Sequence, residues 1–129
     1  MMLFGLICII LLLVVAGLSE AIMDTLAHHF EESIFSKLNP KFWNPVVSGG
    51  NKWKNGDRNQ GERFFLSSTL LVGFTEGWHL FKMFRTLSIF GAFALISGWI
   101  IALIAMILFK TSFTLFYYLY NTTEKPTNL

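Results

Sequence analysis

The chain has few charged residues and a single cysteine, and both shortages restrict what it can be. Charged residues make up 14% of the sequence, against roughly a quarter in an average soluble domain. Cys8 is the only cysteine, so no disulfide can form within the chain. Lysine and arginine form no cluster and the net charge is only +2, so we predict no nucleic-acid partner.

Motifs for common enzyme chemistry are also missing. The hydroxyl-rich run 67–69 has no Gly-x-Ser-x-Gly turn around it, and the sequence contains no glycine-rich phosphate-binding loop. Cys8 lies inside an apolar run without a partner base, which makes it a poor nucleophile. The sequence therefore favours a non-catalytic protein, although it leaves other kinds of enzyme open.

What the sequence has instead is two long apolar runs without charge, residues 1–18 and 86–109. At about 1.5 Å of rise per residue, the second run is long enough to cross a hydrocarbon core of roughly 30 Å. The first run is shorter but can extend into the weakly polar residues that follow it. These runs predict an integral membrane protein.

The first run could instead be a cleaved signal peptide. Residues 19–21 read Ser-Glu-Ala, which places small residues where a signal peptidase prefers them. Against this, no lysine or arginine precedes the run, and the run is longer than the usual apolar core of about 7 to 15 residues. We favour a retained membrane anchor.

The order of apolar and polar segments predicts an all-α integral membrane protein with two or three transmembrane helices and an interfacial amphipathic helix. The expected segments are a transmembrane helix at 1–22, an interfacial helix and polar loop at 23–63, an interfacial or second transmembrane helix at 64–85, a transmembrane helix at 86–110, and an aromatic interfacial segment with a polar tail at 111–129.

The amphipathic helix is predicted from apolar residues at every fourth position after the first run, Ile22, Leu26, Phe30 and Ile34. We expect this helix to stop at Asn39-Pro40, because the residue before a proline is pushed away from helical angles. In the polar loop that follows, the pair Asn55-Gly56 suits a tight hairpin turn.

Segment 64–85 decides whether the chain crosses the membrane two or three times. Lys82 and Arg85 separate it from the last apolar run, and no Gly, Pro or Asn lies between them to form a tight turn. This favours one continuous helix that bends at the interface, with three crossings a close alternative. In both arrangements the positive-inside rule places the 23–63 loop in the cytoplasm, and we expect a bacterial inner membrane.

Histidines and carboxylates near membrane depth are the candidate functional residues, because ionisable groups are costly there. Glu76 and His79 are three residues apart, so on a helix they project from one face. Carboxylate–histidine pairs on two packed helices hold the metals of di-metal bundles. The candidate metal ligands are therefore Asp24, His29, Glu76 and His79, which would suit Zn, Mn or Fe.

The same residues have a simpler interpretation, in which no cofactor is bound. Pairs at helical spacing arise by chance in a chain of this length. Asp24 would then lie on a solvated helix face, and Glu76 would pair with Lys82 or Arg85.

Three functions follow from these observations. The leading one is a non-catalytic membrane component or accessory subunit, in contact with lipids and with another copy or another membrane protein. Small residues Gly91, Ala94 and Gly98 allow the close helix packing that this function needs. The alternatives are a lipid-directed metal-dependent enzyme, in which the metal activates water, and a small pore or holin-like protein. No spanning helix has the clear polar stripe that a pore needs.

Three strings, residues 21–26, 35–45 and 77–82, resemble a group of small bacterial and phage integral membrane proteins. The resemblance spans residues 20–85. It departs in the loop, where residues 48–52 read Ser-Gly-Gly-Asn-Lys and the group has Ser-Trp-x-Asn-Lys. The resemblance implies a membrane protein and carries no activity.

Overall fold

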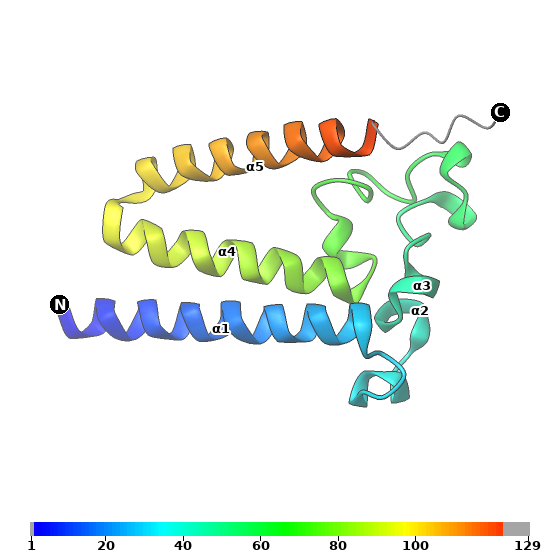
Figure 1. Ribbon diagram of the computed structural model, residues 1–129, viewed down its shortest axis with the longest axis horizontal. Helices are drawn as coiled ribbons and strands as arrows, with labels where there is room; N and C mark the ends of the chain where they lie inside the picture. Colours follow the sequence, from blue (N-terminus) through cyan, green and yellow to red (C-terminus); the bar gives the residue numbers. More distant parts are fainter. Residues whose placement is uncertain (1, 123–129) are drawn as a thin grey trace.

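Three long helices make up most of the structure (Figure 1). The computed structural model describes residues 2–122, with side chains placed for residues 3–116. The long helices are α1 (Met2–His28), α4 (Gly77–Ser97) and α5 (Trp99–Thr122). All regular structure in this part of the chain is helical, apart from one isolated bridge, which confirms the expected all-α class.

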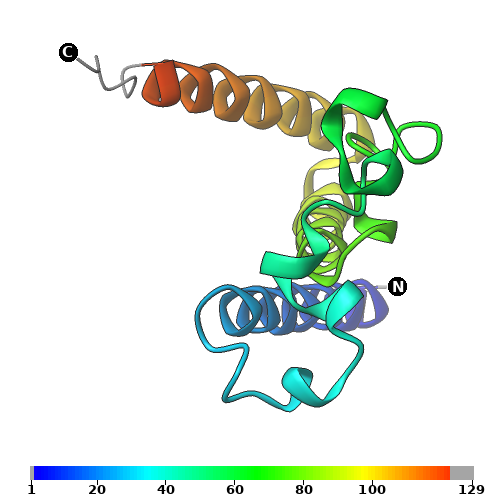
Figure 2. The same ribbon diagram turned by 90° about the vertical axis from the view of Figure 1, so that its right-hand side faces the viewer.

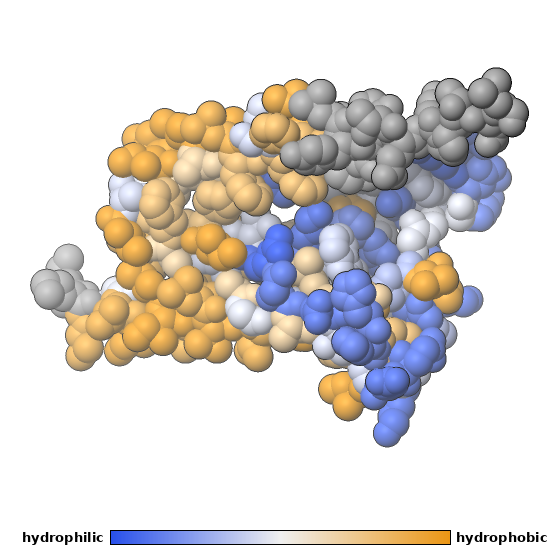
Figure 3. Space-filling view, viewed as in Figure 1, coloured by the Kyte–Doolittle hydropathy of each residue, from blue (hydrophilic) through white to orange (hydrophobic). Residues whose placement is uncertain are grey.

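All three helices are long and apolar enough to cross a membrane. The candidate spans in the described residues are Leu3–His28, Gly77–Ser97 and Trp99–Phe116. Apolar residues cover these helices, whereas hydrophilic residues gather at the end where α1 stops and α4 starts (Figure 3). The structure thus offers three candidate crossings where the sequence left two or three open.

Short turns of helix connect α1 to α4 and form a polar headpiece, residues 29–76. Two of them, α2 and α3, begin with a proline whose fixed φ suits the first helical position. The asparagine before each proline caps it, accepting a backbone N–H at 3.0 Å. The elements of the headpiece are η1 (Ile34–Lys37), α2 (Pro40–Trp43), α3 (Pro45–Ser48), η2 (Lys54–Gly56), η3 (Arg58–Gln60) and η4 (Val72–Phe74).

The expected amphipathic helix does not continue to Asn39, because α1 ends at His28. Ser33 Oγ accepts the N–H of Phe35 at 3.2 Å and starts a new turn, as serine often does in competition with a continuing helix. Ile34, which was expected on the apolar stripe, is 75% exposed. The proline at 40 starts a short helix instead of ending a long one.

The apolar run 86–110, expected to be one transmembrane helix, is divided at Gly98. Here φ is +88°, a conformation that glycine adopts without strain, and the Gly98 N–H donates to Ala94 O at 2.9 Å. Segment 64–85 also differs from the expectation, since it is α-helical only from Gly77 onward. Lys82 and Arg85 therefore lie inside α4, and the 82–85 stretch is continuous helix, as its lack of turn residues predicts.

Other expectations concern turns and the C-terminal segment. Asn55 and Gly56 have φ of +54° and +77°, as an Asn-Gly turn requires. The isolated β-bridge that closes the loop joins Trp53 to Glu62, so the loop is longer than a two-residue hairpin turn. Segment 111–129, expected to be aromatic and interfacial with a polar tail, continues α5 as far as Thr122. The polar tail at 123–129 lies outside the described residues.

Small residues bring α1 and α4 close together. Buried positions on α1 recur at spacings of three and four, and buried Ser88 and Ala92 are four residues apart on α4. A Cβ on Gly91 would lie 3.4 Å from Leu12 Cδ1, so of the predicted small residues this one faces α1. Such residues let helix backbones approach closely. The buried residues of α1 are Ala16, Ser19, Met23 and Leu26.

The third long helix, α5, packs on α4 rather than on α1. Figure 2 shows α4 between the other two helices. Ala102 is buried in this contact, and the Phe90 and Phe109 rings lie 6.1 Å apart. Helices α4 and α5 are joined at Gly98 and diverge toward the headpiece (Figure 1).

Candidate functional site

Glu76 and His79 lie in a buried polar cluster where the headpiece meets α4. The Glu76 side chain is 6% exposed and that of His79 25% exposed. His79 Nδ1 contacts Glu76 Oε1, and Ser48 Oγ donates to Glu76 Oε2 at 3.0 Å. The contact predicted from their spacing of three residues is confirmed, whereas the role of Ser48 was not predicted.

The carboxylate of Glu76 is stabilised in its charged form. Burial raises its pKa, but hydrogen bonds from His79 and Ser48 and the positive charge of Lys52 together lower that pKa below its usual value of 4.5. An ionised carboxylate only accepts hydrogen bonds, so Nδ1 of His79 must carry the proton that it shares with Glu76. Glu76 thus fixes the orientation and the tautomer of His79.

Further hydrogen bonds tie the headpiece together around this cluster. Asn51 Nδ2 donates to Thr75 O at 3.0 Å and also to Lys41 O, which links three distant segments. Ser67 is fully buried, and its Oγ donates to Lys52 O at 2.7 Å. In the described residues no buried side-chain nitrogen or oxygen lacks a hydrogen-bond partner. The buried polar groups therefore hold the backbone in place.

Glu62 organises the turn that follows. Its carboxylate accepts the N–H groups of Leu66 at 3.0 Å and Ser68 at 3.1 Å, and it also accepts Ser68 Oγ. The hydrogen bonds from Ser68 lower the pKa of Glu62. Leu66 has φ of +57°, a conformation that is uncommon for a residue with a side chain. The turn supports the segment that leads to α4.

An apolar contact fixes the start of α4 against the headpiece and α1. A Cβ on Gly77 would lie 3.1 Å from Trp43 Cε3 and 3.5 Å from Leu26 Cδ1, so only glycine fits without movement. The Trp43 ring stacks on Phe35 at 5.1 Å and lies 6.1 Å from Phe81. Leu26 is the one residue of the predicted stripe that is buried here.

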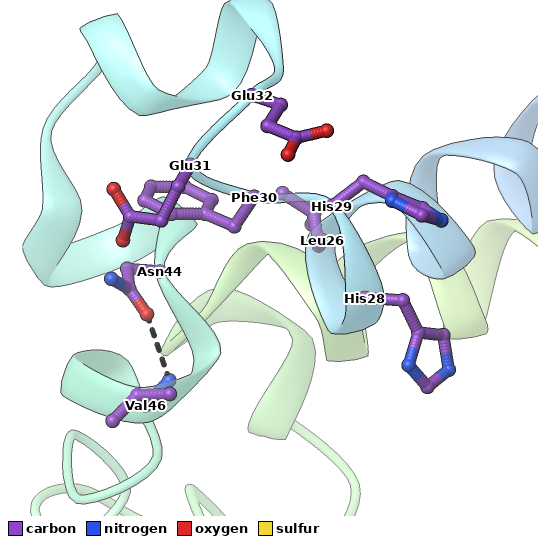
Figure 4. Close-up of a pocket in the computed structure, with 8 residues that line it drawn as sticks. All are labelled: Leu26, His28, His29, Phe30, Glu31, Glu32, Asn44 and Val46. Carbon is purple, nitrogen blue, oxygen red and sulfur yellow. Dashed lines mark hydrogen bonds between the residues drawn. The ribbon is translucent and has the colours of Figure 1, made fainter.

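The second group of candidate residues, at the end of α1, is exposed. Asp24 Oδ1 and His28 Nε2 lie 3.9 Å apart, with both side chains more than two-thirds exposed. A pocket of about 330 Å³ is lined by His28, His29 and Glu31, among others. In Figure 4 the imidazoles of His28 and His29 point away from the carboxylate of Glu31. These residues have the character of a solvated helix end.

The four proposed metal ligands do not come together. Glu76 and His79 form the buried pair, whereas Asp24 and His29 are exposed at the end of α1. Within the part of the chain that the structure describes, no three His, Cys, Asp or Glu side chains are grouped so as to hold a metal ion. The physical reason is that α1 stops at His28, while Ser48 and His79 already occupy both oxygens of Glu76.

A groove of about 850 Å³ opens between α4, α5 and residues 68–73, and sequence reasoning missed it. Its lining is mostly apolar, but Lys82 of α4, Lys110 of α5 and His79 also line it. The sequence shows both lysines inside apolar surroundings. Their meeting depends on the turn at Gly98, which the apolar run does not reveal.

Lys82 is held by aromatic rings. Its Nζ lies 4.8 Å from the centroid of the Trp78 ring and 5.3 Å from that of Phe113. Arg85, the other proposed partner of Glu76, pairs with Glu20 of α1. Among the described carboxylates none forms an ion pair with Lys82 or Lys110. The expected pairing of Glu76 with Lys82 or Arg85 is therefore wrong.

No family model, curated protein or solved structure matches the chain. The resemblance to small bacterial and phage membrane proteins thus stays a prediction.

Proposed function

We propose that this chain is a non-catalytic multi-pass membrane protein whose headpiece faces the cytoplasm and whose exposed helix faces pack against another copy or another membrane protein. The observation that carries the proposal is the one-sided distribution of charge. Residues 2–19 and 86–109, which form the far halves of the three helices, contain no Lys, Arg, Asp or Glu. Every described charged side chain lies in the headpiece or in the halves of the helices next to it.

The basic residues support the orientation. Cytoplasmic loops and the adjoining helix ends of membrane proteins carry an excess of Lys and Arg. Because the chain turns at Gly98, Lys82, Arg85 and Lys110 all lie toward the headpiece end of their helices. The headpiece itself adds Lys37, Lys41, Lys52, Lys54, Arg58 and Arg63.

The polar groups of the headpiece support a structural role. Catalytic groups usually converge on a cavity, where they can contact a substrate. Here Ser48 Oγ donates to Glu76, and Asn51 Nδ2 donates to the backbone carbonyls of Thr75 and Lys41, so these groups tie parts of the headpiece together. The four residues proposed as metal ligands of a lipid-directed enzyme are not grouped together among the described residues. No contact of the described residues favours the pore.

Site-directed labelling tests the topology. Single cysteines replace Asn59 in the headpiece and Trp99 in the far turn, in a Cys8→Ala background. Intact cells that carry each variant are treated with a membrane-impermeant maleimide. We expect labelling at 99 from outside and at 59 only after lysis. Labelling of both from the same side would refute three crossings with a cytoplasmic headpiece.

Photo-crosslinking tests the packing. A crosslinker at Ile101 or Ile104, both more than half exposed on α5, should capture a second copy or a second membrane protein. The same crosslinker at Ala102, which is buried against α4, is the matched control and should give only intramolecular products. Adducts with lipid alone at all exposed positions of α1 and α5 would refute the packing role.

A further inference from the structure

The groove between α4, α5 and residues 68–73 combines a lipid-like lining with positive charge. Side chains from all three walls make it apolar, among them Val72, Met83, Leu87 and Ile107. Lys82 and Lys110 enter it from facing helices. Its volume of about 850 Å³ is at the upper end of the usual range for small-molecule sites. The natural occupant is a molecule with an apolar body and an anionic head.

We propose that this groove binds a phospholipid with an anionic headgroup, its phosphate between Lys82 and Lys110 and an acyl chain between α4 and α5. The inference rests on the proposed function, since it requires both helices to span the membrane. The proposed function requires only surfaces for helix packing, whereas a lipid in the groove would be a specific ligand.

The charges around the groove favour an anion. Lys110 and Arg85 both lie close enough to Lys82 to act on it electrostatically. Arg85 is neutralised by Glu20, but no described carboxylate pairs with either lysine of the groove. The acid closest to them along α4, Glu76, is already bonded to Ser48 and His79. Within the described part of the chain the two ammonium groups thus have no carboxylate partner, and a phosphate would supply one counter-charge for both.

The depth of the two lysines matches a headgroup. Counted from the turn at Gly98, Lys82 lies 16 residues away along α4 and Lys110 lies 12 residues away along α5. At 1.5 Å of rise per residue their Cα atoms are about 24 and 18 Å from that turn, in the half of a hydrocarbon core of roughly 30 Å that is next to the headpiece. Lysine side chains at this depth extend to the interface. Trp78, beside Lys82, is a residue typical of the same level.

Hydroxyl groups at the same level complete the head site. Thr111 follows Lys110 on α5 and Thr69 belongs to the third wall, whereas the hydroxyls of Thr86 and Ser68 already donate to Lys82 O and to Glu62. Hydroxyls can donate to phosphate oxygens without adding a repelling charge. The apolar residues Leu87, Met106 and Ile107 lie farther from the headpiece, where the acyl chain would run.

Native mass spectrometry of the full-length chain in detergent, with equal amounts of phosphatidylglycerol and phosphatidylcholine added, tests the inference. We expect wild type to retain phosphatidylglycerol preferentially. A basic residue near a membrane surface favours anionic lipid by about fivefold, so Lys82→Gln with Lys110→Gln should reduce the preference roughly 25-fold. Lys41→Gln with Lys54→Gln, which removes two exposed headpiece lysines, is the matched control and should keep it.

A second variant separates the apolar part of the site from its charge. Met106→Trp fills the groove and leaves both lysines, so it should lower retention of both lipids. Ile104→Trp adds the same ring to an exposed position that does not line the groove, and it should leave retention unchanged. Circular dichroism of each variant identifies any that fail to fold.

Three results would overturn the inference. They are equal retention of the two lipids by wild type, an unchanged preference in the double lysine variant, and displacement of the lipid by inorganic phosphate alone, which would indicate a plain anion site. The labelling at 59 and 99 is repeated on the same variants. If wild type shows no preference for phosphatidylglycerol but the labelling still indicates three crossings, only the lipid site is refuted. If positions 59 and 99 are labelled from the same side, the proposed function itself is refuted.

Discussion

The two helices that flank α4 contact it in different ways. On the α1 side the contact is close and continuous, with Ser88 and Ala92 buried and Leu12 against Gly91. On the α5 side the helices meet near Gly98 and then diverge around a groove with two lysines. The difference shows how helices of similar hydropathy can either pack or separate. Small side chains line the close contact, whereas two lysines and larger apolar residues line the groove.

The largest effect should come from overfilling the close contact. Ala92 is 3% exposed, so Ala92→Leu forces a larger side chain between α1 and α4. We expect a loss of about 3 kcal/mol in the free energy of unfolding, because added methyl groups in a packed core displace their neighbours. Unfolding of the purified protein by SDS titration measures this. Ala94→Leu, at a less buried position of the same helix, is the control, and an equal loss there would contradict the comparison.

A slightly smaller effect is expected at Glu76, where the headpiece joins α4. Glu76→Gln should cost about 2 kcal/mol, because Ser48 and His79 lose a charged acceptor. The pKa of Glu76 is lowered in the folded state, so its contribution is present above pH 4.5 and is lost as the pH falls through the folded value.

Wild type should therefore lose stability on acidification below pH 4.5 more steeply than Glu76→Gln. Thermal unfolding in detergent across a pH series measures the difference. Glu31→Gln, at an exposed position, should follow wild type. Parallel pH profiles for wild type and Glu76→Gln would show that the buried carboxylate is not coupled to folding.

The turn that separates α4 from α5 should show a smaller effect. Gly98 has φ of +88° and ψ of 152°, a region almost restricted to glycine, which costs a residue with a Cβ about 1.5 kcal/mol. Gly98→Ala should therefore destabilise by about that amount, although nothing lies within 4 Å of the added methyl group. Gly5→Ala, within α1 and equally unobstructed, should instead be neutral or stabilising. Destabilisation at both positions would indicate crowding by lipid and not backbone strain.

The smallest effect should come from the ion pair that reinforces the close contact. Glu20 and Arg85 link α1 to α4, but the Glu20 side chain is 58% exposed. Partly exposed pairs contribute about 0.5 kcal/mol. A double-mutant cycle with Glu20→Gln and Arg85→Gln should give a coupling of this size, and Lys82→Gln combined with Glu20→Gln should give none. Coupling between Glu20 and Lys82 would mean that the groove lysine does have a carboxylate partner.

Local patterns in the sequence were enough for parts of the site. The spacing of Glu76 and His79 predicts their contact, although Glu76 is the N-cap of α4 and reaches His79 in the first turn from outside the helix. The positive φ at Asn55 and Gly56 also follows from residue type. The partner of Glu76 could not be found in this way, since Ser48 lies 28 residues earlier in the chain.

Two long apolar runs, 1–18 and 86–109, could be predicted to be helical from the sequence, because helix length and hydropathy depend only on neighbouring residues. Where the second run turns, and so which ends of the helices lie together, could be seen only in three dimensions. An uncharged run of this length satisfies the pattern of one helix as well as that of two halves. The turn at Gly98 places Lys110 beside Lys82 and creates the groove, because a contact between distant residues follows from the path of the whole chain.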